Sequence, residues 1–188
     1  KRYSFRPERT MTRAEVLSTL MRTSYPKVRV YGHFYYDVPE TAWYYDCVER
    51  AFEAGFIDDS VDAFNPDGPA TREFAAQLLS HVMKGSSSDV PLPFTDAADL
   101  APACRDGVQK LLNGGILHGY PDNTFRPKAT ITRAEYAQML GTIIDRDLLT
   151  GDTVNEIYAK EYSRRYFEAS PEEQEFFHDE DIPYPFYG

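Results

Sequence analysis

Residues 119–135 read GYPDNTFRPKATITRAE, and the second half of this stretch occurs three times in the chain. The other copies are FRPERTMTRAE at residues 5–15 and, in altered form, FNPDGPATREF at residues 64–74. Each copy begins with Phe, has Pro two residues later and places Arg eight residues after the Phe. A motif that returns roughly every 60 residues indicates repeated supersecondary units that stack on one another.

A second pair of matching segments lies upstream of the two later copies. Residues 34–57 (FYYDVPETAWYYDCVERAFEAGFI) parallel residues 94–117 (FTDAADLAPACRDGVQKLLNGGIL). Both read as a loop with an Asp, an amphipathic helix and a Gly that stops the helix. The first helix is expected to begin near residue 42 in one unit and near residue 101 in the other.

A second helix is expected after each repeated Arg, because apolar residues follow it at helical spacing. These residues are Val16, Leu17, Leu20 and Met21, then Phe74, Leu78, Leu79 and Val82, then Tyr136, Leu140, Ile143 and Ile144. The sequence therefore predicts an all-α protein with complete helix-loop-helix units at residues 25–84 and 85–150. Residues 1–24 are expected to be the back half of a preceding unit, and Lys84 to Pro93 read as a linker.

The last segment, residues 151–188, carries no repeat. It holds ten acidic and three basic residues, which is −7 of the net charge of −10. Residues 152–168 read as a helix, and a capping box with Ser170 as N-cap predicts another. We expect an acidic, aromatic helical tail. Because a half unit would expose apolar faces of the others, we also expect either this helix or self-association to cover them.

Composition excludes several classes of function. The net charge of −10 argues against a nucleic-acid partner, and no apolar run approaches the length of a membrane span. Cys47 and Cys104 provide neither metal-site spacing nor a disulfide framework, so we expect two buried free thiols. The four histidines are scattered, and no catalytic triad order, HExxH, P-loop or dinucleotide loop appears. We therefore expect no enzyme, no metal and no cofactor.

The TRAE sequences at residues 12–15 and 132–135 match the capping box, in which the Thr and the Glu each hold the other's amide. This explains the Thr and the Glu but not the Arg. An Arg at the first helical position faces the positive end of the helix dipole, which costs roughly 0.3–1 kcal/mol. Two explanations stay open: an ion pair, with Asp37 or Asp96 as candidates, or an external anion held by the guanidinium and the free first-turn amides.

The middle copy departs from this pattern. Its Glu73 comes one place early and Phe74 takes the third helical position, so the reciprocal cap is lost. It also has Asn65 where the other copies have Arg, and we expect it to be the weakest anion site. In the loop of the last copy, Phe125 is expected in the core and Tyr120 as a flat exposed face.

Taken together, these motifs resemble the S-layer homology modules of bacterial cell-surface proteins. The resemblance rests on the F-x-D loop, the helix that ends in G-I/L, GYPDNTFRP and ITRAE, and covers roughly residues 1–147. It implies three tandem modules in a pseudo-threefold, all-helical spindle in an extracellular, wall-associated protein. It also implies non-covalent binding of an anionic secondary cell-wall polysaccharide, often bearing pyruvate ketals, in grooves between modules.

The resemblance further implies which residues bind the sugar. Carried over position by position, they are Arg13, Arg72, Arg133, Gly119, Tyr120 and Asp122, with Trp43 as either a core residue or a groove wall. The expected partner is the anionic wall polysaccharide, without nucleic acid or membrane insertion. Self-association, or a cargo domain fused outside this chain, is a further expectation. The alternative is a degenerate scaffold that mediates protein–protein assembly at the cell surface without binding glycan.

Overall fold

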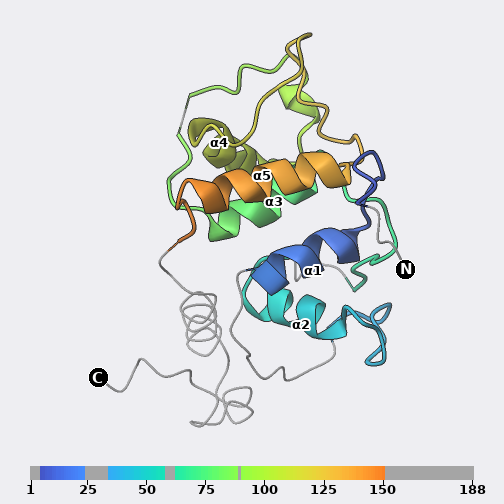
Figure 1. Cartoon of the computed structure of the whole chain (residues 1–188). Helices are drawn as coiled ribbons and strands as arrows, with labels where there is room; N and C mark the ends of the chain where they lie inside the picture. The colour runs from blue at the N-terminus through green and yellow to red at the C-terminus, as the bar shows by residue number, and fades with distance from the viewer. Residues whose placement is uncertain (1–4, 24–33, 58–61, 89, 151–188) are drawn as a thin grey trace, which may run out of the picture. The chain divides into compact units, whose positions relative to one another are not determined.

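The computed structural model describes residues 5–23, 34–57, 62–88 and 90–150. Within these residues the regular elements are helical, and β-pairing is confined to isolated bridges. The elements are α1 (Arg13–Thr23), α2 (Tyr45–Glu53), α3 (Arg72–Val82), η1 (Ala97–Asp99), η2 (Pro102–Cys104), α4 (Arg105–Asn113) and α5 (Arg133–Asp145), as Figure 1 shows. The all-α prediction is confirmed for this part of the chain. The predicted tail, residues 151–188, lies outside the described residues.

The chain divides into two compact units. The first comprises Lys1–Leu20 and Asn65–Gly151, and contains α3, α4 and α5. The second comprises Met21–Phe64 and Asp152–Gly188, and contains α2. The spindle of whole modules and the module boundaries at residues 24, 84 and 150 stay predictions.

Within the first unit, the three copies of the repeated phrase join in a closed ring of backbone hydrogen bonds. The amide of Met11 donates to the carbonyl of Ile131 (3.1 Å), that of Ile131 to Ala70 (2.9 Å) and that of Ala70 back to Met11 (2.9 Å). The first two amides of each helix also donate to the loop of another copy: Arg13 to Gly68 and Ala14 to Pro66, Arg72 to Ala129 and Glu73 to Pro127, Arg133 to Arg9 and Ala134 to Pro7. The three helix starts are therefore related by an approximate threefold pattern.

The Phe of each complete unit is fixed by the Asp of that unit's leading loop. Asp96 accepts the amides of Phe125 and Arg126, both at 2.8 Å, and Asp37 accepts the amide of Phe64 at 2.9 Å. Phe64 and Phe125 are both fully buried, which confirms the core position predicted for Phe125. The two aspartates thus build the loops, which is a role that the sequence interpretation did not assign to them.

The first helices begin later than predicted. α2 begins at Tyr45 rather than near residue 42, and α4 begins at Arg105 rather than near residue 101. Turns at residues 39–44 and the 3-10 turn η2 occupy the intervening positions. The predicted glycine stops are confirmed, because Gly55 and Gly115 have φ of 68° and 63°, a left-handed conformation that glycine adopts at no steric cost.

Most of the apolar residues predicted for the second helices are buried, with two exceptions. Phe74 is half-buried and Ile144 is 43% exposed. Cys47 and Cys104 are free thiols, as predicted, but they are half-buried rather than buried. Within the described residues, no helix has both the length and the apolar character that crossing a membrane requires, and no cluster of side chains has metal-binding geometry.

Candidate functional site

The helix caps follow the sequence prediction. The hydroxyl of Thr132 accepts the amide of Glu135 (3.3 Å) and the Glu135 carboxylate accepts the amide of Thr132 (2.9 Å). Thr12 and Glu15 make the same reciprocal pair at 3.2 and 3.1 Å. In the middle copy Thr71 caps the amide of Phe74 at 3.3 Å without a reciprocal bond. Local sequence is sufficient to specify these contacts.

The caps and the ring together overturn one explanation of the repeated Arg. At each of the three helix starts, the first two amides donate to carbonyls of another copy and the third donates to the capping Thr. An external anion therefore cannot be held by free first-turn amides, because these amides are already used. Any anion site at these helix starts depends on the guanidinium groups.

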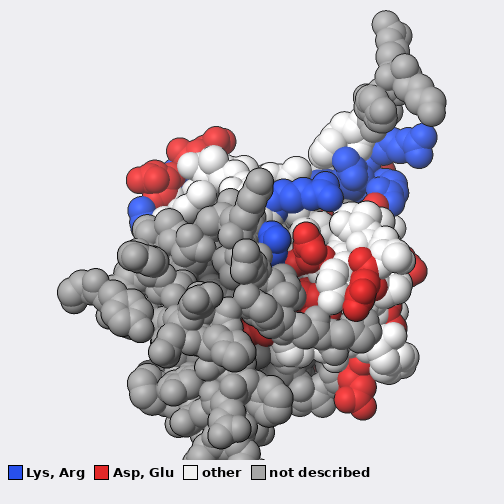
Figure 2. Space-filling view, turned by 90° about the horizontal axis from the view of Figure 1, so that it is seen from below, with Lys and Arg blue, Asp and Glu red and all other residues white. Residues whose placement is uncertain are grey.

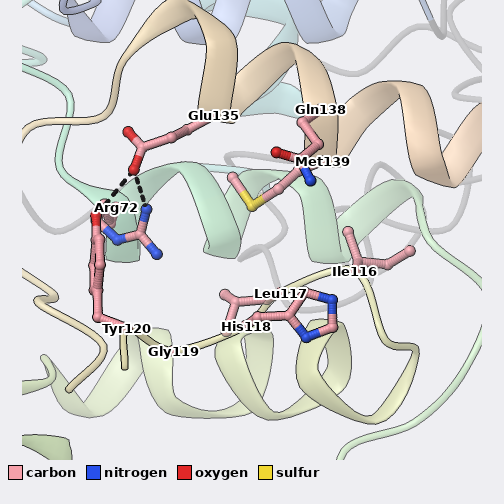
Figure 3. Close-up of a pocket in the computed structure, with 9 residues that line it drawn as sticks. All are labelled: Arg72, Ile116, Leu117, His118, Gly119, Tyr120, Glu135, Gln138 and Met139. Carbon is pink, nitrogen blue, oxygen red and sulfur yellow. Dashed lines mark hydrogen bonds and ion pairs between the residues drawn. The ribbon is translucent and has the colours of Figure 1, made fainter. Parts of the chain in front are cut away.

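Arg72 lies in a pocket of about 180 Å³ between the start of α3, the segment after α4 and one side of α5 (Figure 3). Its guanidinium is buried and donates through Nη1 to Glu135 Oε1 at 2.8 Å and through Nε to the carbonyl of Phe125 at 3.0 Å. The ion-pair explanation therefore applies to Arg72, but its partner is Glu135 and not an aspartate of the leading loops. The lining residues are Arg72, Ile116, Leu117, His118, Gly119, Tyr120, Glu135, Gln138 and Met139.

Tyr120 completes this pocket as an amphipathic wall. Its hydroxyl donates to Glu135 Oε1 at 2.9 Å, and the Arg72 guanidinium carbon lies 4.9 Å from its ring centroid (Figure 3). The Arg126 guanidinium also stacks on this ring, at 3.9 Å. Tyr120 is half-buried rather than an exposed face. Gly119 lies so close to Phe94 that a Cβ would come within 2.6 Å of its ring, so only glycine allows the loop to pass.

The charge of Arg72 is neutralised inside the protein. Burial raises the pKa of Glu135, but hydrogen bonds from Thr132 and Tyr120 and the charge of Arg72 outweigh it, so its pKa lies below the ordinary value. Glu135 is therefore ionised at neutral pH. An anionic ligand that enters this pocket has to compete with a carboxylate already bound to Arg72.

Asp122 holds the loop rather than lining the pocket. Its Oδ1 accepts the amide and the hydroxyl of Thr124, and its Oδ2 pairs with Arg126 Nη2 at 2.9 Å. The hydrogen bonds from Thr124 and then Arg126 lower the pKa of Asp122 to about 2. Asp122 thereby helps to place Arg126 over Tyr120.

Arg133 lies in a second hollow of about 260 Å³, which is mostly apolar. Its Nε donates to the carbonyl of Phe5 at 2.8 Å and its guanidinium lies 5.2 Å from the Phe5 ring centroid. Among the described residues, Arg133 pairs with no carboxylate. The hollow is lined by Phe5, Met11, Thr19, Arg133, Tyr136, Ala137, Leu140, Gly141 and Ile144.

The remaining predicted site residues lie elsewhere. The Arg13 guanidinium lies 4.0 Å from the ring centroid of Phe74, which occupies the repeat position of Glu135. Trp43 belongs to the other compact unit. It is 57% exposed and has the Arg22 guanidinium 5.7 Å from its ring, so the core alternative for Trp43 is wrong.

Sequence reasoning missed Glu135 as a partner of Arg72, and it also missed Arg9. Arg9 pairs with Glu15 at 2.5 Å. The signal for Arg9 was present in the alignment of the copies, because Gly68 and Ala129 occupy the same position. The sequence did not indicate that Glu135 pairs with an arginine, because its role in the capping box already accounted for the presence of a Glu.

Two of these three helix starts, those of α3 and α5, lie within segments that match a known protein family. Residues 34–75 and 93–137 match the S-layer homology domain. The chain is 28% identical to an amylopullulanase of Thermoanaerobacterium thermosulfurigenes over 147 residues, 76% of this chain and 8% of that protein. It is 29% identical to cell surface glycoprotein 1 of Acetivibrio thermocellus over 173 residues, 82% of this chain and 8% of that protein.

A third relative, the cellulosome-anchoring protein of Acetivibrio thermocellus, is 27% identical over 157 residues, which is 78% of this chain and 35% of that protein. The chain thus spans only a small part of the curated relatives it matches. The relatives with enzyme names share with it only a stretch that makes up 8–15% of their length.

Proposed function

Because residues 34–75 and 93–137 match the S-layer homology domain, we propose that this chain is a member of that family and attaches the protein that carries it to the cell wall. The match to this domain and the relatives named for the surface layer and for cellulosome anchoring support a location at the bacterial cell surface. We propose that attachment is non-covalent, that the ligand is an anionic wall polysaccharide bearing pyruvate ketals, and that the chain performs no catalysis of its own.

The observation that carries the proposal is the state of Arg133. Its guanidinium is oriented by one bond to the Phe5 carbonyl and keeps its two terminal nitrogens unpaired within the described residues. A guanidinium fork in this state matches a carboxylate in a bidentate manner. The surrounding walls, which include Met11, Tyr136 and Leu140, are apolar. A pyruvate ketal presents a carboxylate and a methyl group on the same carbon, which fits both features.

The overall negative charge does not oppose this proposal, because charge is unevenly distributed. On the face shown in Figure 2, most of the visible basic side chains gather in one band with acidic side chains beside it. Much of the net charge of −10 comes from residues 151–188. Local positive potential at a guanidinium governs the contact with one carboxylate, while distant charges are screened at physiological salt.

Titration calorimetry with purified pyruvylated wall polysaccharide, against a chemically depyruvylated sample, tests the proposal. We expect binding that requires the ketal and that weakens at least tenfold in Arg133→Ala. Arg105→Ala is the matched control, since Arg105 is an exposed arginine on α4 outside both hollows. An affinity that is unchanged by removal of the ketal, or unchanged in Arg133→Ala, would contradict the proposed site.

The competing function is assembly without glycan binding. It is favoured by the internal neutralisation of Arg72, which removes one of the three candidate anion sites. A folded protein that binds neither polysaccharide, but whose sedimentation coefficient rises with concentration, would support this alternative.

A further inference from the structure

Two carboxylates at the same repeat position have different partners. Glu135 Oε1 pairs with Arg72 of another copy at 2.8 Å, whereas Glu15 Oε1 pairs with Arg9 of its own loop at 2.5 Å. The second oxygen of each carboxylate accepts its own cap amide, at 2.9 Å in Glu135 and 3.1 Å in Glu15. The two glutamates therefore hold their cap amides in the same way but bind different arginines, and Glu135 also accepts the hydroxyls of Tyr120 and Thr132.

Arg133 contacts the first copy of the motif in the same way as Arg72 contacts the third copy. Arg72 Nε donates to the carbonyl of Phe125, and Arg133 Nε donates to the carbonyl of Phe5, the repeat equivalent of Phe125. The backbone ring joins the same pairs of copies, because the amide of Arg72 donates to Ala129 and that of Arg133 donates to Arg9. By the repeat, Glu15 occupies the same position relative to Arg133 as Glu135 occupies relative to Arg72. Even so, no ion pair forms between Glu15 and Arg133.

Arg9 accounts for this difference. Among the three copies, its position carries a long basic side chain only in the first, since Gly68 and Ala129 occupy it in the others. Arg9 competes for the Glu15 oxygen that would otherwise face Arg133. The group of Arg9, Glu15 and Arg133 then has a net charge of +1, whereas the pair of Arg72 and Glu135 has none.

We propose that Arg9 is a positioning residue for anion binding: by holding Glu15 it leaves the Arg133 guanidinium available to a ligand carboxylate. This inference rests on the proposed function and adds to it that the two hollows are not equivalent. The Arg133 hollow accepts a carboxylate with a small apolar substituent, and the Arg72 pocket is closed to anions by Glu135. Arg9, which lies in the loop outside the repeated Thr-Arg pair, thus determines which of the two hollows can bind an anion.

The first test is a mutant cycle measured by calorimetry with pyruvylated wall polysaccharide. We expect Arg9→Ala to weaken binding roughly three- to tenfold, because Glu15 then pairs with Arg133 and lowers the fraction of binding-competent protein. Glu15→Gln keeps the cap, since Gln also serves in a capping box. We therefore expect Arg9→Ala with Glu15→Gln to regain the affinity, and Arg9→Lys to retain most of it.

A matched control separates pairing from simple loss of charge. Arg6→Asn removes the same charge from the same loop, and Asn65 shows that Asn adopts the left-handed backbone of this position, with φ of 55° against 49° for Arg6. We expect less than a twofold change in affinity. An equal loss in Arg6→Asn and Arg9→Ala, or unchanged affinity in Arg9→Ala, would overturn the role of Arg9.

A second readout needs no glycan. The side-chain NMR signals of Arg133 in the free protein should show slowed rotation of the guanidinium in Arg9→Ala, and wild-type behaviour when Glu15→Gln is added. If wild type binds no glycan but these signals shift as stated, the proposed ligand is wrong and the positioning by Arg9 stands. Signals that are the same in wild type and Arg9→Ala would overturn the positioning itself.

Discussion

α3 and α5 begin with the same Thr-Arg pair in successive copies, yet the two arginines are used differently. Arg72 is buried and paired with Glu135, whereas Arg133 lies in an apolar hollow without a carboxylate partner among the described residues. The difference does not arise in the local sequence of either helix start. It arises because each arginine faces another copy, so that the other copy determines whether the guanidinium is neutralised.

The first helices of the two complete modules show a second contrast of the same kind. Glu49 on α2 and Gln109 on α4 occupy the same place in the repeat, and both are buried. Gln109 donates to Asn113 at 3.0 Å. Glu49 accepts the amide of Phe34 at 3.3 Å with one oxygen, while its other oxygen has no hydrogen-bond partner among the described residues. The second module thus buries a carboxyl where the third buries an amide.

The largest expected effect separates the two arginines by their contribution to stability. Arg72→Ala leaves Glu135 without its cation in a partly buried site and removes the bond to the Phe125 carbonyl. We expect the free energy of unfolding to fall by about 3 kcal/mol. Arg133→Ala, which removes one exposed hydrogen bond and the contact with the Phe5 ring, should cost less than about 1 kcal/mol. Urea denaturation at pH 7 measures both.

Equal losses in the two variants would break the comparison, because they would show that Arg133 is also a structural residue. The double variant Arg72→Ala with Glu135→Gln tests whether the loss in Arg72→Ala comes from the unpaired Glu135 carboxylate. Removing the carboxylate along with its partner should recover part of the loss, since no uncompensated charge is left behind.

The second prediction uses pH to compare the two modules. Burial raises the pKa of Glu49 to about 7, with the Phe34 amide opposing and the charge of Glu53 adding to the shift. The folded protein therefore favours the protonated carboxyl. This contribution to stability is full below about pH 4.5, the ordinary value, and is lost as the pH rises to about 7.

Glu49→Gln should therefore raise the free energy of unfolding at pH 8 by about 2 kcal/mol and leave it nearly unchanged at pH 4. Urea unfolding at both pH values measures the difference. Gln109→Glu is the reciprocal variant, and we expect it to install a similar loss of stability above neutral pH in the third module. A wild-type stability that is as high at pH 8 as at pH 5, with Glu49→Gln unchanged, would contradict the assignment.

Features fixed by neighbouring residues could be predicted from the sequence. The reciprocal caps of Thr12 and Thr132, their loss in the middle copy, the glycine stops and the burial of Phe125 all follow from short-range patterns. Each depends on residues within one turn or one loop, where stereochemistry allows few alternatives.

Features that depend on the ring could not be predicted in this way. Arg72 and Glu135 are 63 positions apart, and nothing in either motif indicates that they meet. The candidate aspartates, Asp37 and Asp96, were plausible partners for an arginine until the fold assigned them to the Phe loops. Trp43 shows the same limit, because its exposure depends on packing rather than on its position in a helical pattern.

The smallest expected effect compares the caps of α5 and α3. Thr132 both accepts the amide of Glu135 and donates its hydroxyl to the Glu135 carboxylate at 2.9 Å, and this carboxylate also holds Arg72. The Thr71 hydroxyl accepts the amide of Phe74, and among the described residues it donates to no carboxylate. We expect Thr132→Ala to lower the free energy of unfolding by about 1–2 kcal/mol and Thr71→Ala by about 0.5–1 kcal/mol.

Thermal unfolding of both variants checks the order, and Thr→Ser at each position is the control, because Ser retains the capping oxygen. The reason for the difference is that Glu135 links its cap to the ion pair with Arg72, so that losing Thr132 loosens a contact with α3 as well as the start of α5. If Thr132→Ala retains its larger cost in an Arg72→Ala background, this link is absent and the cap acts on α5 alone. If the cost falls to that of Thr71→Ala, cap and ion pair are coupled through Glu135.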